Sequence, residues 1–156
     1  MHAQTDRSSP VAASVVREAL AWVGTPYRHQ ATHKGVGCDC LGLVRGVWRS
    51  LYDFDLEPPG TYSVDWAEAG GEEKLLAGAR RHFHEKSLSD AQAGDLLVFR
   101  WRPHLPAKHA GILVAEHRFV HAYQGGGAVT ISTLVPQWRK RIAAVLAFPE
   151  FPDISI

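Results

Sequence analysis

The chain has 156 residues, with 17 Lys and Arg against 16 Asp and Glu, so its formal net charge is +1. This balance does not favour nucleic acid or an anionic membrane as a general partner, and no apolar run reaches the ~18 residues that a membrane span requires. The length fits one domain with its own core, which we expect over residues 1–156 with the packed part at about 10–150.

The first predicted element is a helix that begins at Ser9 and Pro10, an N-cap followed by proline at the first helical position. Its apolar residues recur at helical spacing, and Gly24 and Pro26 end it. A polar loop, 25–37, follows. The segment before this helix, 1–10, lacks the charged and apolar regions of a secretory signal, so we expect synthesis in the cytoplasm without a signal peptide.

A second helix is predicted to begin at Cys40, with Asp39 as its N-cap. Its buried face is formed by Leu41, Val44, Val47, Trp48 and Leu51. Unpaired N–H groups and the helix dipole at this end favour a thiolate, the nucleophilic form of cysteine, so we expect a lowered pKa for Cys40. Taken alone, Cys40 would more often be one more buried apolar side chain. Cys38 is too close in sequence for a comfortable disulfide with it.

The rest of the chain predicts one more long helix and then a series of strands. The helix is expected over 65–84, with Gly70-Gly71 as a weak point. Strands are expected at 96–101, 110–115, 118–123, 128–132 and 142–148, with a helical turn at 136–140. Helices followed by an antiparallel sheet make an α+β fold, with the Cys40 helix packed on the sheet.

Two histidines could serve the thiol as proton carriers. His109 begins an apolar strand, where Gly111 would let another backbone or a helix come close. His121 shares a strand face with Phe119 and Tyr123. If the two strands form a hairpin, His121 can reach the ring nitrogen of His109 that faces away from Cys40, which gives the order nucleophile, base and orienting group.

Five segments, in this order, resemble the signature blocks of the NlpC-type papain-like cysteine peptidases, which cut bacterial cell walls. They are Trp22-Val23-Gly24-Thr25-Pro26-Tyr27, Gly37-Cys38-Asp39-Cys40-Leu41-Gly42-Leu43-Val44, Ala93-Gly94-Asp95-Leu96-Leu97-Val98-Phe99, His109-Ala110-Gly111-Ile112 and Phe119-Val120-His121-Ala122. The resemblance covers about 14–148. Leucine after Cys40 looks closest to the branch found in phage and gene transfer agent tail modules.

The resemblance implies a role for each matching residue. Cys40 would be the nucleophile, His109 the general base and later acid, and His121 the residue that fixes the tautomer of His109. Tyr27 matches the family tyrosine beside the nucleophile that helps at the oxyanion, and Asp39 matches as a structural cap. Many members have serine at the position of Leu41 and lack the thiol of Cys38, which leaves an oxidised or metal-bound off state open.

The implied reaction is hydrolysis of a stem-peptide bond in peptidoglycan, typically between the side-chain carboxyl of D-glutamate and the following diamino acid. It needs no metal or cofactor. Stem peptides carry carboxylates, so Arg28, Lys34, Arg45 or Lys108 could hold them, although each could be an ordinary surface charge.

The same resemblance implies a place of action. A cell-wall enzyme without an export signal would be consistent with a protein carried in the tail of a virion-like particle. There it would bind tail hub or tail-tip proteins and act on the periplasmic wall of the next cell. We expect a monomer when the chain is isolated, with no nucleic acid partner and no membrane insertion.

Three alternatives remain at this stage. The first is a structural tail-tip protein with little activity. The second is a metal site using Cys38, Cys40 and His29 or His33, although the spacing fits zinc poorly. The third is another acyl chemistry on the same fold, since this fold also serves amidases and acyltransferases.

Overall fold

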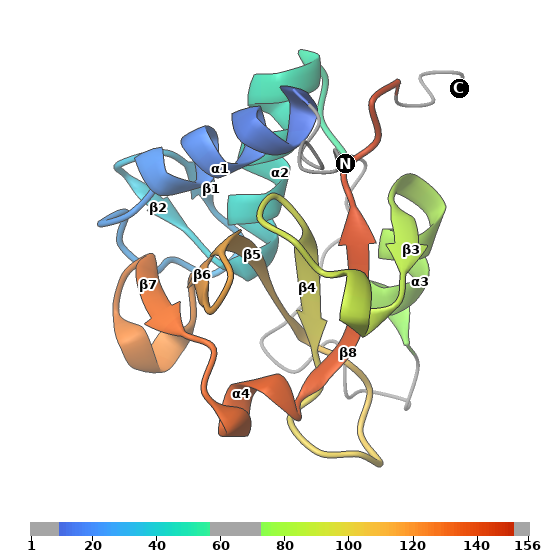
Figure 1. Cartoon of the computed structure of the whole chain (residues 1–156). Coiled ribbons are helices and arrows are strands. Elements are labelled where there is room, and N and C mark those ends of the chain that lie inside the picture. Colours follow the sequence, from blue (N-terminus) through green and yellow to red (C-terminus); the bar gives the residue numbers. More distant parts are fainter. Residues whose placement is uncertain (1–9, 57–72, 152–156) are drawn as a thin grey trace.

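The structure is a computed structural model that describes residues 10–56 and 73–151 (Figure 1). Its helices are α1 (Pro10–Ala21), α2 (Cys40–Tyr52), α3 (Lys74–His82) and α4 (Pro136–Arg139). Its strands are β1 (Thr32–His33), β2 (Gly37–Cys38), β3 (His84–Lys86), β4 (Leu96–Phe99), β5 (His109–Ala115), β6 (Arg118–His121), β7 (Thr130–Thr133) and β8 (Ile142–Ala147). None of the helices in these two ranges has the length and hydropathy of a membrane span.

The larger sheet has the strand order β3-β8-β4-β5-β6-β7, and every neighbouring pair is antiparallel. Helices α1 and α2 lie together on one side of it and pack on β5 (Figure 1). This confirms the predicted α+β fold with the Cys40 helix on the sheet. The sequence did not predict β1, β2 or β3, which are two or three residues long. The predicted helix at 65–84 is observed as α3, and its first part lies outside the described residues.

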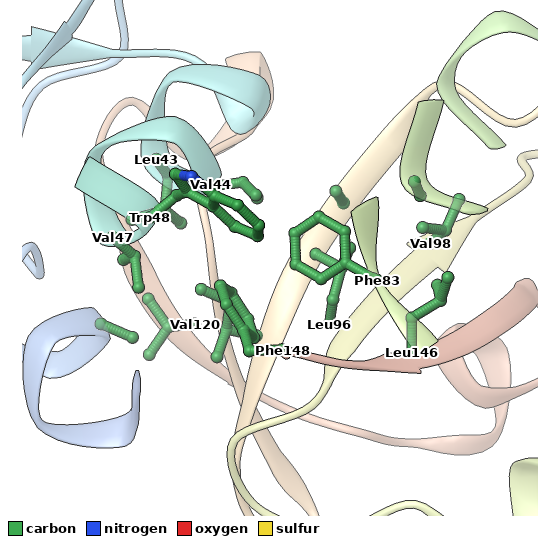
Figure 2. Close-up of a cluster of buried hydrophobic side chains, with 14 of the residues drawn as sticks. Leu43, Val44, Val47, Trp48, Phe83, Leu96, Val98, Val120, Leu146 and Phe148 are labelled. Carbon is green, nitrogen blue, oxygen red and sulfur yellow. The ribbon is translucent and has the colours of Figure 1, made fainter. Parts of the chain in front are cut away.

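The main core lies between α2 and the sheet (Figure 2). Figure 2 shows Trp48 of α2 beside Phe83 and Phe148, and the ring centroids of Trp48 and Phe83 are 5.2 Å apart. Strand β4 is buried on both faces: Leu96 and Val98 belong to this core, whereas Leu97 and Phe99 belong to a second one on the other face. Burial on both faces explains why β4 reads as an unbroken apolar run without alternation.

Two glycines let the rest of the chain come close to α2. A Cβ on Gly46 would lie 2.0 Å from Cζ2 of Trp22, and a Cβ on Gly42 would lie 1.8 Å from the carbonyl oxygen of Ala31. Any side chain at either position would force α1 or the 25–37 loop away. The glycines therefore let α2 lie close to Trp22 and to the 25–37 loop.

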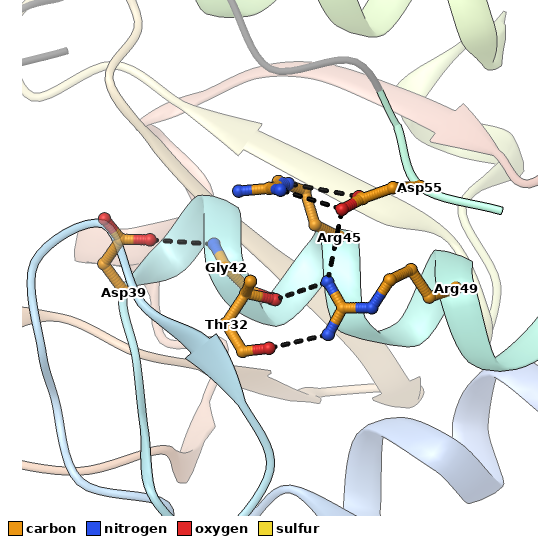
Figure 3. Close-up of polar contacts among 6 residues, drawn as sticks. All are labelled: Thr32, Asp39, Gly42, Arg45, Arg49 and Asp55. Carbon is orange, nitrogen blue, oxygen red and sulfur yellow. Dashed lines mark hydrogen bonds and ion pairs between the residues drawn. The ribbon is translucent and has the colours of Figure 1, made fainter. Parts of the chain in front are cut away.

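Polar contacts fasten the other side of α2 to β1 (Figure 3). Arg49 donates from Nη2 to the carbonyl oxygen of Thr32 at 2.6 Å and from Nη1 to its hydroxyl at 3.0 Å. Arg45 makes two bonds to the carboxylate of Asp55, at 3.2 and 2.8 Å. Figure 3 shows both arginines reaching from α2 toward Asp55. The charge of Arg45, a candidate for holding substrate carboxylates, is thus already paired within the fold.

Candidate active site

Cys40 is the first residue of α2, and Asp39 caps the helix as predicted. One oxygen of Asp39 accepts the N–H of Gly42 at 2.8 Å, and the other accepts the N–H of Gln30 at 2.6 Å. The carboxylate is 3% exposed, so both bonds are shielded from water. Figure 3 shows the bond between Asp39 and Gly42. With its second bond, to Gln30, Asp39 joins the 25–37 loop to the helix and fixes the backbone that carries the thiol.

The Cys40 thiol lies against the backbone on both sides of His109. Its Sγ is 3.9 Å from the carbonyl oxygen of Lys108, and the N–H groups of Ala110 and Leu41 lower its pKa by favouring the thiolate. Burial, and then the Asp39 carboxylate, act more strongly in the other direction and raise the pKa of Cys40 to about 12. The expectation of a lowered thiol pKa is therefore wrong, because burial and a neighbouring negative charge outweigh the start of the helix.

Three polar side chains form a line from β5 to β7. His109, the first residue of β5, has its Nε2 2.9 Å from Nδ1 of His121, and Nε2 of His121 lies 2.8 Å from Oγ of Ser132. The hairpin of β5 and β6, in which Gly111 faces His121, produces the first contact as predicted. Gly111 does admit a close neighbour, but that neighbour is β6: an added Cβ would lie 3.0 Å from the carbonyl oxygen of Val120.

Burial favours the neutral form of both imidazoles. His121 is fully buried, which lowers its pKa to about 4. Burial, and next the facing His121, lower the pKa of His109 well below its usual range. Nδ1 of His109 is the ring nitrogen that is not bonded to His121, and it is the nitrogen left to accept a proton.

Aromatic rings enclose the two imidazoles. Trp101 stacks on His109 with ring centroids 5.3 Å apart and planes at 24°. Tyr123 stacks on His121 at 4.8 Å, and Trp138 meets His121 edge-on at 5.0 Å. Sequence reasoning missed Trp101 and Trp138 as parts of the site. It placed them at the end of the strand 96–101 and in the turn 136–140, but neither pattern shows that a ring lies against a histidine. It also missed Ser132, although the alternation along β7 could have placed its side chain on the same face as His121.

Tyr27 lies close to the thiol. Its backbone N–H donates to the carbonyl oxygen of Gly127 at 2.9 Å, and Tyr27 forms an isolated bridge with Cys38. Burial, and next the negative charge that Cys40 would carry, raise the pKa of Tyr27 to about 12. The phenol therefore stays protonated and can act as a hydrogen-bond donor beside the sulfur.

The predicted substrate-binding cations have different surroundings. Lys34 pairs with Glu18 at 2.7 Å. The side-chain stem of Arg28 lies over Gly37, where an added Cβ would come within 2.4 Å of its Cδ. Lys108 contributes its backbone carbonyl to the thiol site. Their role toward substrate stays a prediction.

Cys38 lies in the hydrophobic core and is fully buried. Burial raises the pKa of its thiol to about 12, and the Asp39 carboxylate adds to this. Within residues 10–56 and 73–151, no group of three or more His, Cys, Asp or Glu is placed to hold a metal ion. The alternative of a metal site on Cys38 and Cys40 therefore gains no support from the described residues.

Known proteins are similar to this chain in sequence and in fold. The NlpC/P60 family matches residues 24–147. The chain is 29% identical over 136 residues to the Escherichia coli K12 protein named murein DD-endopeptidase MepS/murein LD-carboxypeptidase. The aligned residues cover 86% of this chain and 62% of the Escherichia coli protein. It is 32% identical over 120 residues to a probable endopeptidase of Haemophilus influenzae, covering 76% of this chain and 63% of the relative.

Solved structures agree with the sequence matches. The NlpC/p60 domain of the peptidoglycan hydrolase SagA has a TM-score of 0.60 and 26% identity, over 88% of this chain and 98% of that one. RipD of Mycobacterium tuberculosis, titled a non-catalytic NlpC/p60 domain protein, has a TM-score of 0.55 at 14% identity and shows the fold alone. The chain spans 62% of the length of MepS, so the match concerns one part of that relative. The family match and the shared fold together place the chain in the NlpC/P60 family.

Proposed function

We propose that this protein is a cysteine peptidase that hydrolyses a stem-peptide bond of peptidoglycan. The observations that carry the proposal are the Cys40 sulfur against the carbonyl oxygen of Lys108, the residue before His109, and the polar line from His109 through His121 to Ser132. Such an arrangement supplies a nucleophile, a base and an orienting group. The names of the relatives MepS and SagA support peptidoglycan as the substrate class.

The mechanism begins with proton transfer from the Cys40 thiol to Nδ1 of His109. Nδ1 of His109 can accept this proton only if its lone pair is free. The proton of neutral His109 must therefore lie on Nε2, which donates a hydrogen bond to Nδ1 of His121. His121 then carries its own proton on Nε2 and donates a hydrogen bond to Ser132, whose half-buried hydroxyl can in turn donate a hydrogen bond to water. The thiolate forms together with an imidazolium, so each charge offsets the desolvation of the other.

The thiolate attacks the scissile carbonyl carbon, and the carbonyl electrons move to oxygen. The N–H of Cys40 lies in the first turn of α2, where N–H groups have no partner within the helix, and it can stabilise this oxyanion together with the Tyr27 hydroxyl. His109 then gives its proton to the leaving amine. Water, activated by the neutral imidazole, hydrolyses the acyl-enzyme.

Cys40→Ala tests the proposal in a turbidity and muropeptide assay on purified peptidoglycan. We expect at least about a thousandfold loss of hydrolysis, because no other group on the line can form the acyl-enzyme. Cys38→Ala is the matched control, since it removes a neighbouring sulfur that faces the core; it should retain most activity in the folded fraction. Equal digestion by Cys40→Ala and the parent protein would remove the mechanism.

For the bond cleaved, we propose the one between the side-chain carboxyl of D-glutamate and the following diamino acid. MepS is named as a DD-endopeptidase, which cuts elsewhere in the stem network. Mass spectrometry of products from defined muropeptides separates these cuts, since each leaves a different stem fragment. Products of a DD-cut alone would overturn our assignment and leave the cysteine mechanism in place.

We also propose that a phage-like or gene transfer agent tail delivers the enzyme to the wall of the target cell. Support comes from the block around Cys40, in which leucine follows the nucleophile. Tail hub or tail-tip proteins would then be its partners. Immunoblotting of purified particles, and pull-down with tail hub proteins, should detect the chain. Its absence from the particles would overturn the delivery, and normal infection by Cys40→Ala particles would favour a structural tail role.

A further inference from the structure

A basic hollow lies beside the candidate active site. It is formed where the chain leaves β4 and where it enters β8, and its volume is about 720 Å³. The N–H of Arg100 donates to the carbonyl oxygen of Arg141 at 2.7 Å, so two segments far apart in sequence lie side by side here (Figure 1). Trp101, Arg102 and Lys140 complete the polar and aromatic part of its lining.

The charge of this basic hollow is not balanced locally. Arg100 is paired with Glu73. For Arg102, Lys140 and Arg141, no carboxylate in the described ranges forms an ion pair, and none of the described residues that line the hollow is acidic. Arg141 lies instead over two indole rings, 5.5 Å from the centroid of Trp101 and 5.8 Å from that of Trp138. Three positive charges therefore face one concave surface of a chain whose net charge is only +1.

Trp101 connects the basic hollow to the reacting groups, because its ring stacks on His109. An anionic group bound in the hollow would thus be separated from the catalytic imidazole by a single indole. The cations chosen from the sequence are less suitable, since Lys34 and Arg45 are already paired with Glu18 and Asp55.

We propose that the basic hollow binds carboxylates of the peptidoglycan stem peptides and so positions the polymer across Cys40. This rests on the proposed function, in which the wall is the substrate. The guanidinium groups of Arg102 and Arg141 suit carboxylates because each presents two parallel N–H donors. Lys140 adds a point charge at the open side, where it is exposed.

The test is binding, so that it does not depend on catalysis. Full-length protein carrying Cys40→Ala is co-sedimented with purified sacculi, with and without the further pair Arg102→Gln and Lys140→Gln. We expect the pair to weaken binding roughly tenfold at low salt, since two surface charge contacts are lost. Arg141 is left unchanged because it packs on Trp101 and Trp138.

The control pair, Arg17→Gln and Arg118→Gln, lowers the net charge equally at exposed positions away from the basic hollow. Equal weakening by both pairs, or no weakening by the first, would overturn the proposal. Amidating the sacculus carboxylates should abolish the difference in sacculus binding between the Cys40→Ala protein and the same protein with Arg102→Gln and Lys140→Gln. If the difference survives amidation but disappears when phosphate polymers are stripped with hydrofluoric acid, the carboxylate assignment is wrong.

The binding test can fail for the basic hollow while the proposed catalytic function still stands. A hydrolase that loses activity with Cys40→Ala but binds sacculi equally with and without the first pair would keep its mechanism and lose this binding site.

Discussion

The thiol and the imidazoles are held by different kinds of contact. Around Cys40 the contacts run mostly to backbone: Asp39 binds two N–H groups, and the sulfur lies against Lys108 and Ala110. Around His109 and His121 they run between side chains, through ring stacking and a line of hydrogen bonds that ends at Ser132. The nucleophile thus depends on the course of the chain, whereas the base depends on the identity of its neighbours.

This difference predicts what a substitution would change at the imidazoles and what it would change at the helix cap. A change on the imidazole side should alter protonation while the fold persists, whereas a change at the cap should alter the backbone and the thiol together. Three measurements sharpen the comparison, in order of decreasing effect.

The largest expected effect is acid destabilisation by the imidazole side. The pKa of His121 is lowered to about 4 in the folded chain, against an unfolded value near 6.5. Between these values the unfolded state binds more protons, so stability falls as the pH falls from about 6.5 to about 4, by roughly 3 kcal/mol. His109 acts in the same direction. Urea unfolding from pH 7.5 to 4.5 measures this loss.

His121→Asn is the matched variant, since it keeps polar atoms but does not titrate in this range. Its stability should vary less with pH than that of the parent chain. Parallel curves for the two proteins would contradict the assignment of a buried neutral His121.

The next effect is at the helix cap. Asp39→Ala removes the acceptors for Gly42 and Gln30 and should cost about 2 kcal/mol of stability. Asp39→Asn keeps one acceptor and should cost less. Both remove a negative charge that raises the pKa of Cys40, so that pKa should fall. Chemical denaturation measures the first effect, and the pH dependence of alkylation by iodoacetamide the second.

An unchanged alkylation profile in Asp39→Asn would show that the Asp39 charge does not raise the pKa of the thiol. The control is Asp90→Asn, since Asp90 is exposed on another part of the chain. It should alter neither quantity.

The smallest effect is expected at Ser132. Ser132→Ala removes the partner of Nε2 on His121, which favours a proton on Nδ1 instead and turns a donor toward His109. We expect kcat to fall about tenfold with little change in KM. Ser132→Thr keeps the hydroxyl and should restore most of the rate. Nitrogen-15 NMR of His121 reports the tautomer, and an unchanged tautomer in Ser132→Ala would remove Ser132 from the mechanism.

Periodicity and capping predicted much of the site because those signals are local. The spacing from Leu41 to Leu51 predicted α2, Asp39 predicted its start, and alternation along β6 placed His121 on a face that could reach His109. Short elements such as β1 and β2 escaped prediction, because two residues of strand carry no measurable period.

By itself, the sequence determined the α+β order, the cap and the pairing of the two histidines, since each follows from neighbours along the chain. Only the tertiary structure decided the burial that raises the pKa of Cys40 and the aromatic shell of Trp101 and Trp138. It also decided which of the described cations have a carboxylate partner. Burial, ring stacking and ion pairing depend on residues that are distant in sequence, and the packed chain alone brings those residues together.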